Sequence, residues 1–380
     1  MRFSRIVLEN WRNFGRVDVA LQDRAFLVGP NASGKSNFLD AFRFLRDIVL
    51  PGGGFEKAVQ DRGGVSRIRN LAARRVPTVA IEVHLQDGAA VVWRYRIAFA
   101  QDSQRRPILH EESIWQGQDQ ILHRPNPADQ ADTELLRQTH LEQTSANAGF
   151  RPVAEFFASV HYYHLVPQIV RDPERSIGLH ADPYGGDFLQ QIADTAQKTR
   201  EARLRRIGDA LRVAVPQLAE LKLERDERGV PHLQGKYEHW RPAGAWQSEA
   251  DFSDGTLRLM GLLWSLMDKT GPMLLEEPEL SLHPDIVRWI PQMMRRVQRG
   301  QKPRGRQVLV STHSSDLLSD KGIAADEVLL FMPTKEGSQV QVGATLADVK
   351  LLLEAGLSVG EAVLPYTRPP NAAQLALWGE

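Results

Sequence analysis

Eight consecutive residues carry the clearest chemistry in this sequence. Residues 29–36 read Gly-Pro-Asn-Ala-Ser-Gly-Lys-Ser, the pattern G-x-x-x-x-G-K-S. The two glycines permit a tight turn, so that backbone N–H groups converge on phosphate oxygens at the start of a helix. In this pattern the ammonium of Lys35 reaches the β- and γ-phosphates and the hydroxyl of Ser36 coordinates Mg²⁺. The predicted ATP-binding residues are Gly29, Pro30, Asn31, Ala32, Ser33, Gly34, Lys35, Ser36 and Asn37.

The residues on either side of this loop predict the elements that hold it. The apolar run 25–28 is typical of a buried strand, and it stops directly at Gly29. Apolar residues then recur at helical spacing over residues 37–45. Strand, glycine loop and helix in this order are the context that a phosphate loop requires, and a chance match of the pattern would rarely have it. The sequence therefore predicts a site for ATP with Mg²⁺.

A second segment supplies the acidic groups that such a site needs. Residues 272–279 read Pro-Met-Leu-Leu-Glu-Glu-Pro-Glu, an apolar strand that ends in paired carboxylates. Glu276 is the predicted Mg²⁺-side carboxylate, and Glu277 is predicted to polarise the water that attacks the γ-phosphate. The simpler alternative is a strand that runs into a solvated acidic turn.

Two further segments flank the carboxylates. Upstream, Ser253, Asp254 and Gly255 introduce an apolar helical run over residues 257–267, and such a helix start is a second anion site. The alternative is an ordinary N-cap, in which the Ser253 or Asp254 side chain satisfies helix N–H groups. Downstream, the apolar strand 307–312 ends at His313, at about the distance of one β–α–β crossover from the carboxylate strand.

The composition excludes several other kinds of site. Lys and Arg together number 47, as do Asp and Glu, so the formal net charge is zero. This balance excludes a generally basic nucleic-acid coat, although a local basic patch remains open. The chain has no cysteine, which excludes disulfide scaffolds, thiolate metal sites and thiol catalysis. Without a signal peptide or a run of about 18 apolar residues, we expect a cytoplasmic protein with no membrane contact.

Taken in chain order, these motifs resemble those of ATP-binding-cassette (ABC-type) ATPases. More narrowly, the phosphate loop, the S-D-G-T turn, the LLEEPE strand end and the S-T-H strand end resemble the stand-alone branch near RecF, Rad50 and the OLD-family ATPases. This branch is also described as AAA15/AAA21 ATPases and occurs in bacterial anti-phage defence and DNA repair. The resemblance implies an α/β P-loop NTPase fold: an ABC-ATPase-like head with an antiparallel β subdomain and an inserted, mostly helical lobe.

The resemblance also implies how the site works. Members form homodimers that hold two ATP molecules between the subunits, so the turn of Ser253, Asp254 and Gly255 would close on the γ-phosphate held by the partner's Lys35 loop. His313 would be the switch histidine, which contacts the γ-phosphate and orients the water. The loop 279–284 would communicate across the dimer.

The sequence departs from the family pattern at three points. Glu276 stands where most ABC-type ATPases carry Asp, and the usual L-S-G-G-Q turn is reduced to F-S-D-G-T. The glutamine of the Q-loop has two candidates, Gln168 and Gln60. The metal-side acid, the signature turn and the Q-loop are therefore the least typical parts of the predicted site.

The pattern of the whole chain predicts one ATPase head that is split in sequence. Segments 78–85 and 91–100 alternate like paired strands around a Gly88 hairpin turn, whereas residues 101–150 predict a loop-rich, partly helical insertion. Segments 328–332 and 339–342 predict a closing strand pair, followed by a helix over 347–355. The predicted parts are 1–100 for the first half of the head, 101–250 for the inserted lobe, 251–345 for the second half, and 346–380 for a C-terminal helix and tail.

Basic residues leave direct DNA binding open. The longest helical pattern, 187–214, is rich in arginine, and it is either a basic helix that reaches nucleic acid or a solvated amphipathic helix. Two further groups are either a DNA-contacting surface or a solvated rim. They are Arg62, Arg67, Arg69, Arg74 and Arg75, and Arg295, Arg296, Arg299, Lys302, Arg304 and Arg306.

These observations predict an ATPase subunit whose ATP-driven dimer closure controls a separately encoded effector, such as a nuclease. The insert has no sustained heptads, which excludes the long coiled coil of Rad50. OLD-family nucleases continue from their ATPase head into a metal-dependent domain that contains an Asp-x-Asp strand. The residues after His313 contain no such acidic strand. One alternative is a RecF-like DNA repair ATPase that binds DNA directly. The other is a transporter nucleotide-binding subunit, although the reduced F-S-D-G-T turn argues against it.

Overall fold

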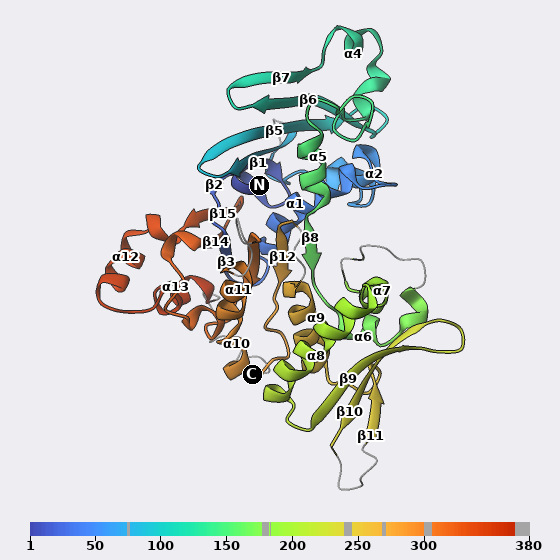
Figure 1. The fold of residues 1–380 in the computed structure, drawn as a ribbon. Coiled ribbons are helices and arrows are strands. Elements are labelled where there is room, and N and C mark those ends of the chain that lie inside the picture. The colour runs from blue at the N-terminus through green and yellow to red at the C-terminus, as the bar shows by residue number, and fades with distance from the viewer. Residues whose placement is uncertain are drawn as a thin grey trace, which may run out of the picture. The chain divides into compact units, whose positions relative to one another are not determined.

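The structure is a computed structural model that describes residues 1–73, 77–176, 182, 184–238, 245–267, 271–299 and 306–368 (Figure 1). Two compact units make up the chain. Unit 1 contains Met1–His161, Thr270–Leu274 and Arg306–Glu380, and unit 2 contains Tyr162–Lys269 and Leu275–Gly305. The predicted basic residues Arg74, Arg75, Lys302 and Arg304, the side chain of Arg299, and the predicted tail from residue 369 onward lie outside the described part of the chain.

Unit 1 contains an antiparallel sheet with the strand order β2-β1-β4-β5-β6-β7. The strands are β1 (Arg2–Trp11), β2 (Phe14–Ala20), β4 (Val79–Asp87), β5 (Ala90–Gln101), β6 (Pro107–Gln116) and β7 (Asp119–Arg124). The predicted hairpin is confirmed, because Asp87 pairs with Ala90 across the turn at Gly88. Strands β6 and β7 lie where a loop-rich segment was predicted. Glu112 and Ser113 are buried in β6, and these polar types hide its alternation.

The second sheet is mixed and has the order β15-β14-β3-β13-β12-β8. Its strands are β3 (Arg24–Val28), β8 (His161–Tyr163), β12 (Met273–Glu276), β13 (Val308–Thr312), β14 (Val328–Thr334) and β15 (Gly337–Val342). The predicted closing pair is confirmed as antiparallel β14 and β15. Strand β3 pairs in parallel with both β13 and β14, so early and late parts of the sequence meet around it. The boundary between the two units falls inside β12 and β8.

Helix α1 (Lys35–Val49) packs against both sheets of unit 1. The ring of Phe42 lies 4.8 Å from that of Phe3 in β1, and the ring of Phe38 lies 5.5 Å from that of Phe331 in β14. The other helices of unit 1 are α2 (Phe55–Gln60), α3 (Val65–Ile68), α4 (Pro127–Ala131), α5 (Arg151–Ala158), α12 (Ala347–Glu354) and α13 (Val359–Thr367). No helix in the described part of the chain is long and apolar enough to cross a membrane.

Unit 2 contains a lobe of helices and a three-stranded sheet with the order β11-β10-β9. Its elements are α6 (Pro167–Val170), α7 (Phe188–Asp194), α8 (Gln197–Ala214), β9 (Leu218–Arg225), β10 (Pro231–Tyr237), β11 (Ala245–Ser248), α9 (Asp254–Met267), α10 (Pro284–Val287) and α11 (Ile290–Arg299). The predicted helix over 187–214 is two helices, because the chain becomes extended at Thr195. The lobe therefore includes a sheet that the helical prediction did not contain.

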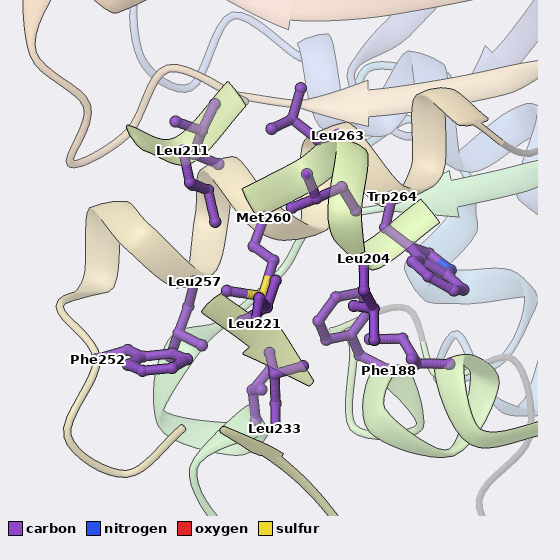
Figure 2. Packing of buried hydrophobic residues seen from close by; sticks show 14 of the residues in the cluster. Phe188, Leu204, Leu211, Leu221, Leu233, Phe252, Leu257, Met260, Leu263 and Trp264 are labelled. Atoms are coloured by element: carbon purple, nitrogen blue, oxygen red, sulfur yellow. The ribbon is translucent and has the colours of Figure 1, made fainter. Parts of the chain in front are cut away.

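One hydrophobic cluster joins the parts of unit 2 (Figure 2). Helix α8 supplies Leu204 and Leu211, β9 supplies Leu221, and α9 supplies Leu257 and Met260. Each of these side chains is at least nine-tenths buried. Because α9 shares its core with α8 and β9, the helix that begins at the S-D-G-T turn is packed directly on the lobe.

A buried ion cluster closes the end of the antiparallel sheet in unit 1. The guanidinium of Arg124 donates hydrogen bonds to Asp129 at 2.6 Å, to Glu112 at 3.1 Å, and to the carbonyl oxygens of Leu135 and Gln138, both at 2.8 Å. The side chains of Arg124, Glu112 and Asp129 are exposed by 1% or less. This cluster ties the segment after β7 to the face of β6.

Replacement of Arg124 by Ala is expected to lower the free energy of unfolding by about 3–5 kcal/mol, because it leaves two buried carboxylates without a cation. Urea denaturation of the purified chain measures the difference. The control is Arg16→Ala, since the Arg16 side chain is 68% exposed in its ion pair with Glu9 and its loss should cost about 1 kcal/mol or less. Equal losses in the two variants would contradict the role of the cluster.

Candidate ATP site

The phosphate loop runs from the end of β3 into α1, as predicted. Gly34 is the N-cap residue of α1 and has φ 98°, a left-handed conformation that glycine adopts without a steric penalty. No side chain caps this helix at Gly34, and its first turn contains no acidic residue. A helix N-terminus without a protein cap is suited to a phosphate, which can accept hydrogen bonds from the first N–H groups.

The side chain of Lys35 is held inside this loop. Its ammonium donates hydrogen bonds to the carbonyl oxygens of Gly29 at 2.9 Å and Pro30 at 3.0 Å, and the residue is only 6% exposed. Asn31, Ala32 and Ser36 are exposed beside it. The loop thus combines a fixed cation with an accessible hydroxyl, and these are the groups that Mg·ATP requires.

The structure brings His313 to the same edge of the sheet as the phosphate loop. Strands β3 and β13 are parallel, and Thr312 at the end of β13 pairs with Val28 at the end of β3. His313 and Gly29 therefore each follow directly on neighbouring strand ends. The His313 side chain is exposed. Both groups belong to unit 1.

The paired carboxylates lie in unit 2 at the end of β12. Glu276 accepts a short hydrogen bond from the phenol of Tyr162, and Nδ1 of His164 lies 3.3 Å from the carbonyl oxygen of Glu276. Glu277 has φ 43°, which is a strained conformation for a residue other than glycine and is typical of functional sites. The sequence did not reveal Tyr162 as a partner of Glu276, because 114 positions separate them.

The S-D-G-T turn has the geometry of a helix N-cap. The Ser253 hydroxyl accepts the N–H of Thr256 at 3.2 Å, and Asp254 accepts a hydrogen bond from Arg171 at 2.6 Å. Of the two Q-loop candidates, Gln168 lies 3.4 Å from the Asp254 carboxylate in unit 2, whereas Gln60 donates to Glu56 on its own helix in unit 1.

Gly255 allows this turn to pack against the loop 279–284. A Cβ atom on Gly255 would lie 2.5 Å from the carbonyl oxygen of Ser281, which is too close for any side chain. Ser281 itself has a left-handed backbone, with φ 62°. The two segments that the family resemblance assigns to the dimer interface are therefore in direct contact within unit 2.

A cation lies near both the turn and the carboxylates of unit 2. Burial lowers the pKa of the Arg258 guanidinium in α9, and the nearby charges of Asp254 and Glu277 and the phenol of Tyr163 act in the opposite direction. Arg258 therefore links the electrostatics of the S-D-G-T turn to those of the carboxylate turn.

Two residues of the predicted basic surfaces have structural roles instead. The Arg62 side chain is 6% exposed and forms ion pairs with Asp40 at 2.8 Å and Asp47 at 2.9 Å. Arg306 is buried and donates a hydrogen bond to the carbonyl oxygen of Gly271 at 2.7 Å. Both lie in arginine-rich stretches of the sequence, but neither guanidinium is available to DNA.

The family model described as "AAA domain, putative AbiEii toxin, Type IV TA system" matches residues 24–320. The chain belongs to this family. The match begins at the first residue of β3 and includes the phosphate loop, the S-D-G-T turn, the paired carboxylates and His313. Membership agrees with the AAA21 ATPase resemblance inferred from the motifs.

Solved structures confirm the fold. An SMC head bound to the C-terminal winged-helix domain of ScpA matches with a TM-score of 0.56 and 16% identity, covering 90% of this chain and 97% of that one. An SMC head with an extended coiled coil, bound to the C-terminal domain of ScpA from Pyrococcus furiosus, matches with a TM-score of 0.51 and 13% identity, covering 93% and 99%. The chain thus has the α/β fold of a P-loop NTPase, in the form of an ABC-ATPase-like head.

A curated relative matches a short stretch. Endonuclease GajA from Bacillus cereus (strain VD045) is 43% identical over 58 residues, which is 15% of this chain. The matched stretch covers 10% of the length of GajA.

Replacement of Gly255 by Ala is expected to displace the loop 279–284 and to destabilise unit 2 by about 1–3 kcal/mol, because the new methyl group overlaps the Ser281 carbonyl. Thermal unfolding and amide hydrogen exchange over residues 253–257 and 280–283 measure this. The matched control is Gly208→Ala in α8, whose Cβ would lie 3.7 Å from Leu221 and should be neutral or stabilising. A Gly255→Ala variant as stable as the wild type, with unchanged exchange, would contradict the packing argument.

Proposed function

We propose that this protein is an ABC-type ATPase subunit that dimerises around ATP and controls a separately encoded effector in anti-phage defence. The observation that carries the proposal is the phosphate loop: a left-handed Gly34 at an uncapped helix start, with the buried ammonium of Lys35 held against the loop carbonyls. Membership in the AAA family supports it.

In this proposal the residues of unit 1 bind the triphosphate. Backbone N–H groups of the loop and of the first turn of α1 surround the phosphate oxygens, and Lys35 neutralises the β- and γ-phosphates. The Ser36 hydroxyl and the Glu276 carboxylate are the residues that would hold Mg²⁺, and the bound ion would neutralise charge at the transferred phosphoryl group. The phenol of Tyr162 donates to Glu276 and so orients that carboxylate.

Glu277 and His313 are the proposed catalytic residues. The carboxylate of Glu277 accepts a proton from the attacking water as general base, and His313 contacts the γ-phosphate and orients the water. The strained backbone at Glu277 supports a functional role for its position, since residues with such strain cluster at active sites.

Dimer closure would bring the second subunit's turn onto the nucleotide. The start of α9 at Ser253, Asp254 and Gly255 provides a second helix N-terminus for the γ-phosphate. The contact of Gly255 with Ser281 supports a coupled movement of this turn and the loop 279–284. ATP binding would in this way set the geometry of the whole dimer.

Control of a nuclease effector is the favoured output, since part of this chain is similar to part of an endonuclease. Direct DNA binding in the manner of RecF is the second candidate, because basic side chains outnumber acidic ones on α8 and Arg205 and Arg206 are exposed there. Salt-sensitive, ATP-dependent binding of duplex DNA by the purified chain would favour the second candidate.

Replacement of Lys35 by Ala is expected to weaken ATP binding by about a hundredfold, because the charged hydrogen bonds to the β- and γ-phosphates are lost. Isothermal titration calorimetry with Mg·ATP measures the affinity. Lys350→Ala, which removes an exposed lysine from α12, is the matched control and should bind like the wild type. Unchanged affinity in the Lys35 variant would contradict the assigned site.

Replacement of Glu277 by Gln is expected to retain ATP but to slow hydrolysis by about a hundredfold or more, because the general base is removed. Phosphate release measures turnover, and light scattering with ATP should show a persistent dimer. The control is Glu354→Gln, an exposed glutamate of α12. Hydrolysis at the wild-type rate in the Glu277 variant would remove its assignment as the base.

A further inference from the structure

The turn between β1 and β2 reaches the phosphate loop through one side chain. Asn13 lies in this turn, and its Nδ2 donates hydrogen bonds to the carbonyl oxygen of Ser33 at 3.1 Å and to the Ser338 hydroxyl at 2.8 Å. Its Oδ1 accepts a hydrogen bond from the Asn37 side chain at 2.8 Å. One amide therefore bonds to the loop before Gly34 and to α1 after it.

These bonds determine the orientation of the loop backbone. The C=O and N–H of a trans peptide point in opposite directions, so a hydrogen bond to the Ser33 carbonyl fixes where the Gly34 N–H points. The bond to Asn37 fixes the first turn of α1 relative to the same amide. Asn13 also packs on Gly34, where a Cβ would lie 2.3 Å from Nδ2.

The same amide also connects the loop to the β14–β15 hairpin. Besides the side-chain bond to Ser338, the backbone N–H of Ser338 donates to the carbonyl oxygen of Asn13 at 2.8 Å. Asn13 is thus anchored on the side away from the loop. An anchored donor can restrain the Ser33–Gly34 peptide, whereas an unanchored one would follow its movements.

We infer that Asn13 is a positioning residue for ATP, which holds the phosphate loop in the conformation that binds the triphosphate. The inference rests on the proposed function, and it assigns a role to a residue outside the phosphate-loop pattern. Without the amide, the Ser33–Gly34 peptide can rotate, and ATP must reorder the loop on binding. This ordering of the loop costs free energy and lowers the affinity for ATP, because a loop that is already ordered avoids that cost.

The test compares ATP affinity and steady-state kinetics in the full chain. Asn13→Ala is expected to bind Mg·ATP about tenfold more weakly, with KM raised and kcat nearly unchanged, because the lost contacts act on the ground state and the transition state alike. Asn13→Asp has nearly the same shape but presents an acceptor to the Ser33 carbonyl, and should lose more affinity than Asn13→Ala.

The matched control is Asn10→Ala. Asn10 lies on the same hairpin, and its Nδ2 donates to the carbonyl oxygen of Thr78 at 2.9 Å, away from the loop. Asn10 has φ 53°, so its replacement also destabilises the hairpin. This control separates a loss of stability, which lowers the active fraction and hence kcat, from a loss of loop position, which raises KM.

Each outcome decides the inference. Weaker ATP binding in both Asn13 variants, with wild-type affinity in Asn10→Ala, supports it. The inference is overturned if the Asn13 variants bind ATP with wild-type affinity, or if Asn10→Ala loses as much ATP affinity as they do. Either result leaves the proposed function intact. Absence of ATP binding in the wild type would overturn both.

Discussion

Helix α1 has to be buried along its length while its first turn stays open to an anion. The burial comes from aromatic contacts with both sheets of unit 1, through Phe42 to Phe3 and through Phe38 to Phe331. The open end comes from Gly34, which provides the turn without a capping side chain. Because packing on two sides fixes the helix axis, the N–H groups of its first turn point in a fixed direction.

Unit 2 has a corresponding arrangement around α9. The start of this helix is the S-D-G-T turn, and its buried face is part of the hydrophobic cluster of α8 and β9 (Figure 2). A rigid, shared core means that the lobe and the turn move as one body, because close-packed interiors transmit displacement instead of absorbing it. A displacement of the lobe would therefore be transmitted to the turn.

The local parts of the site could be predicted from the sequence, and the long-range parts could not. Strand, loop and helix around Lys35 are contiguous, so their pattern and their chemistry appear together. Strand β6 was missed because Glu112 is buried in an ion cluster whose partners lie outside its own strand. The role of Asn13 was invisible for the same reason, since Ser338 is 325 positions away in sequence. Sequence patterns report burial of apolar residues well and burial of satisfied polar residues poorly.

The position of β3 has a consequence for the newly made chain. Both neighbours of β3 in the sheet, β13 and β14, come from residues after Arg306, and Arg24 pairs with Val308. A chain that emerges from the ribosome thus exposes the apolar strand before the phosphate loop long before its partners exist, and pairing across such a separation is slow. The strand that leads into the phosphate loop therefore gains both of its sheet neighbours only after residue 330 has been synthesised.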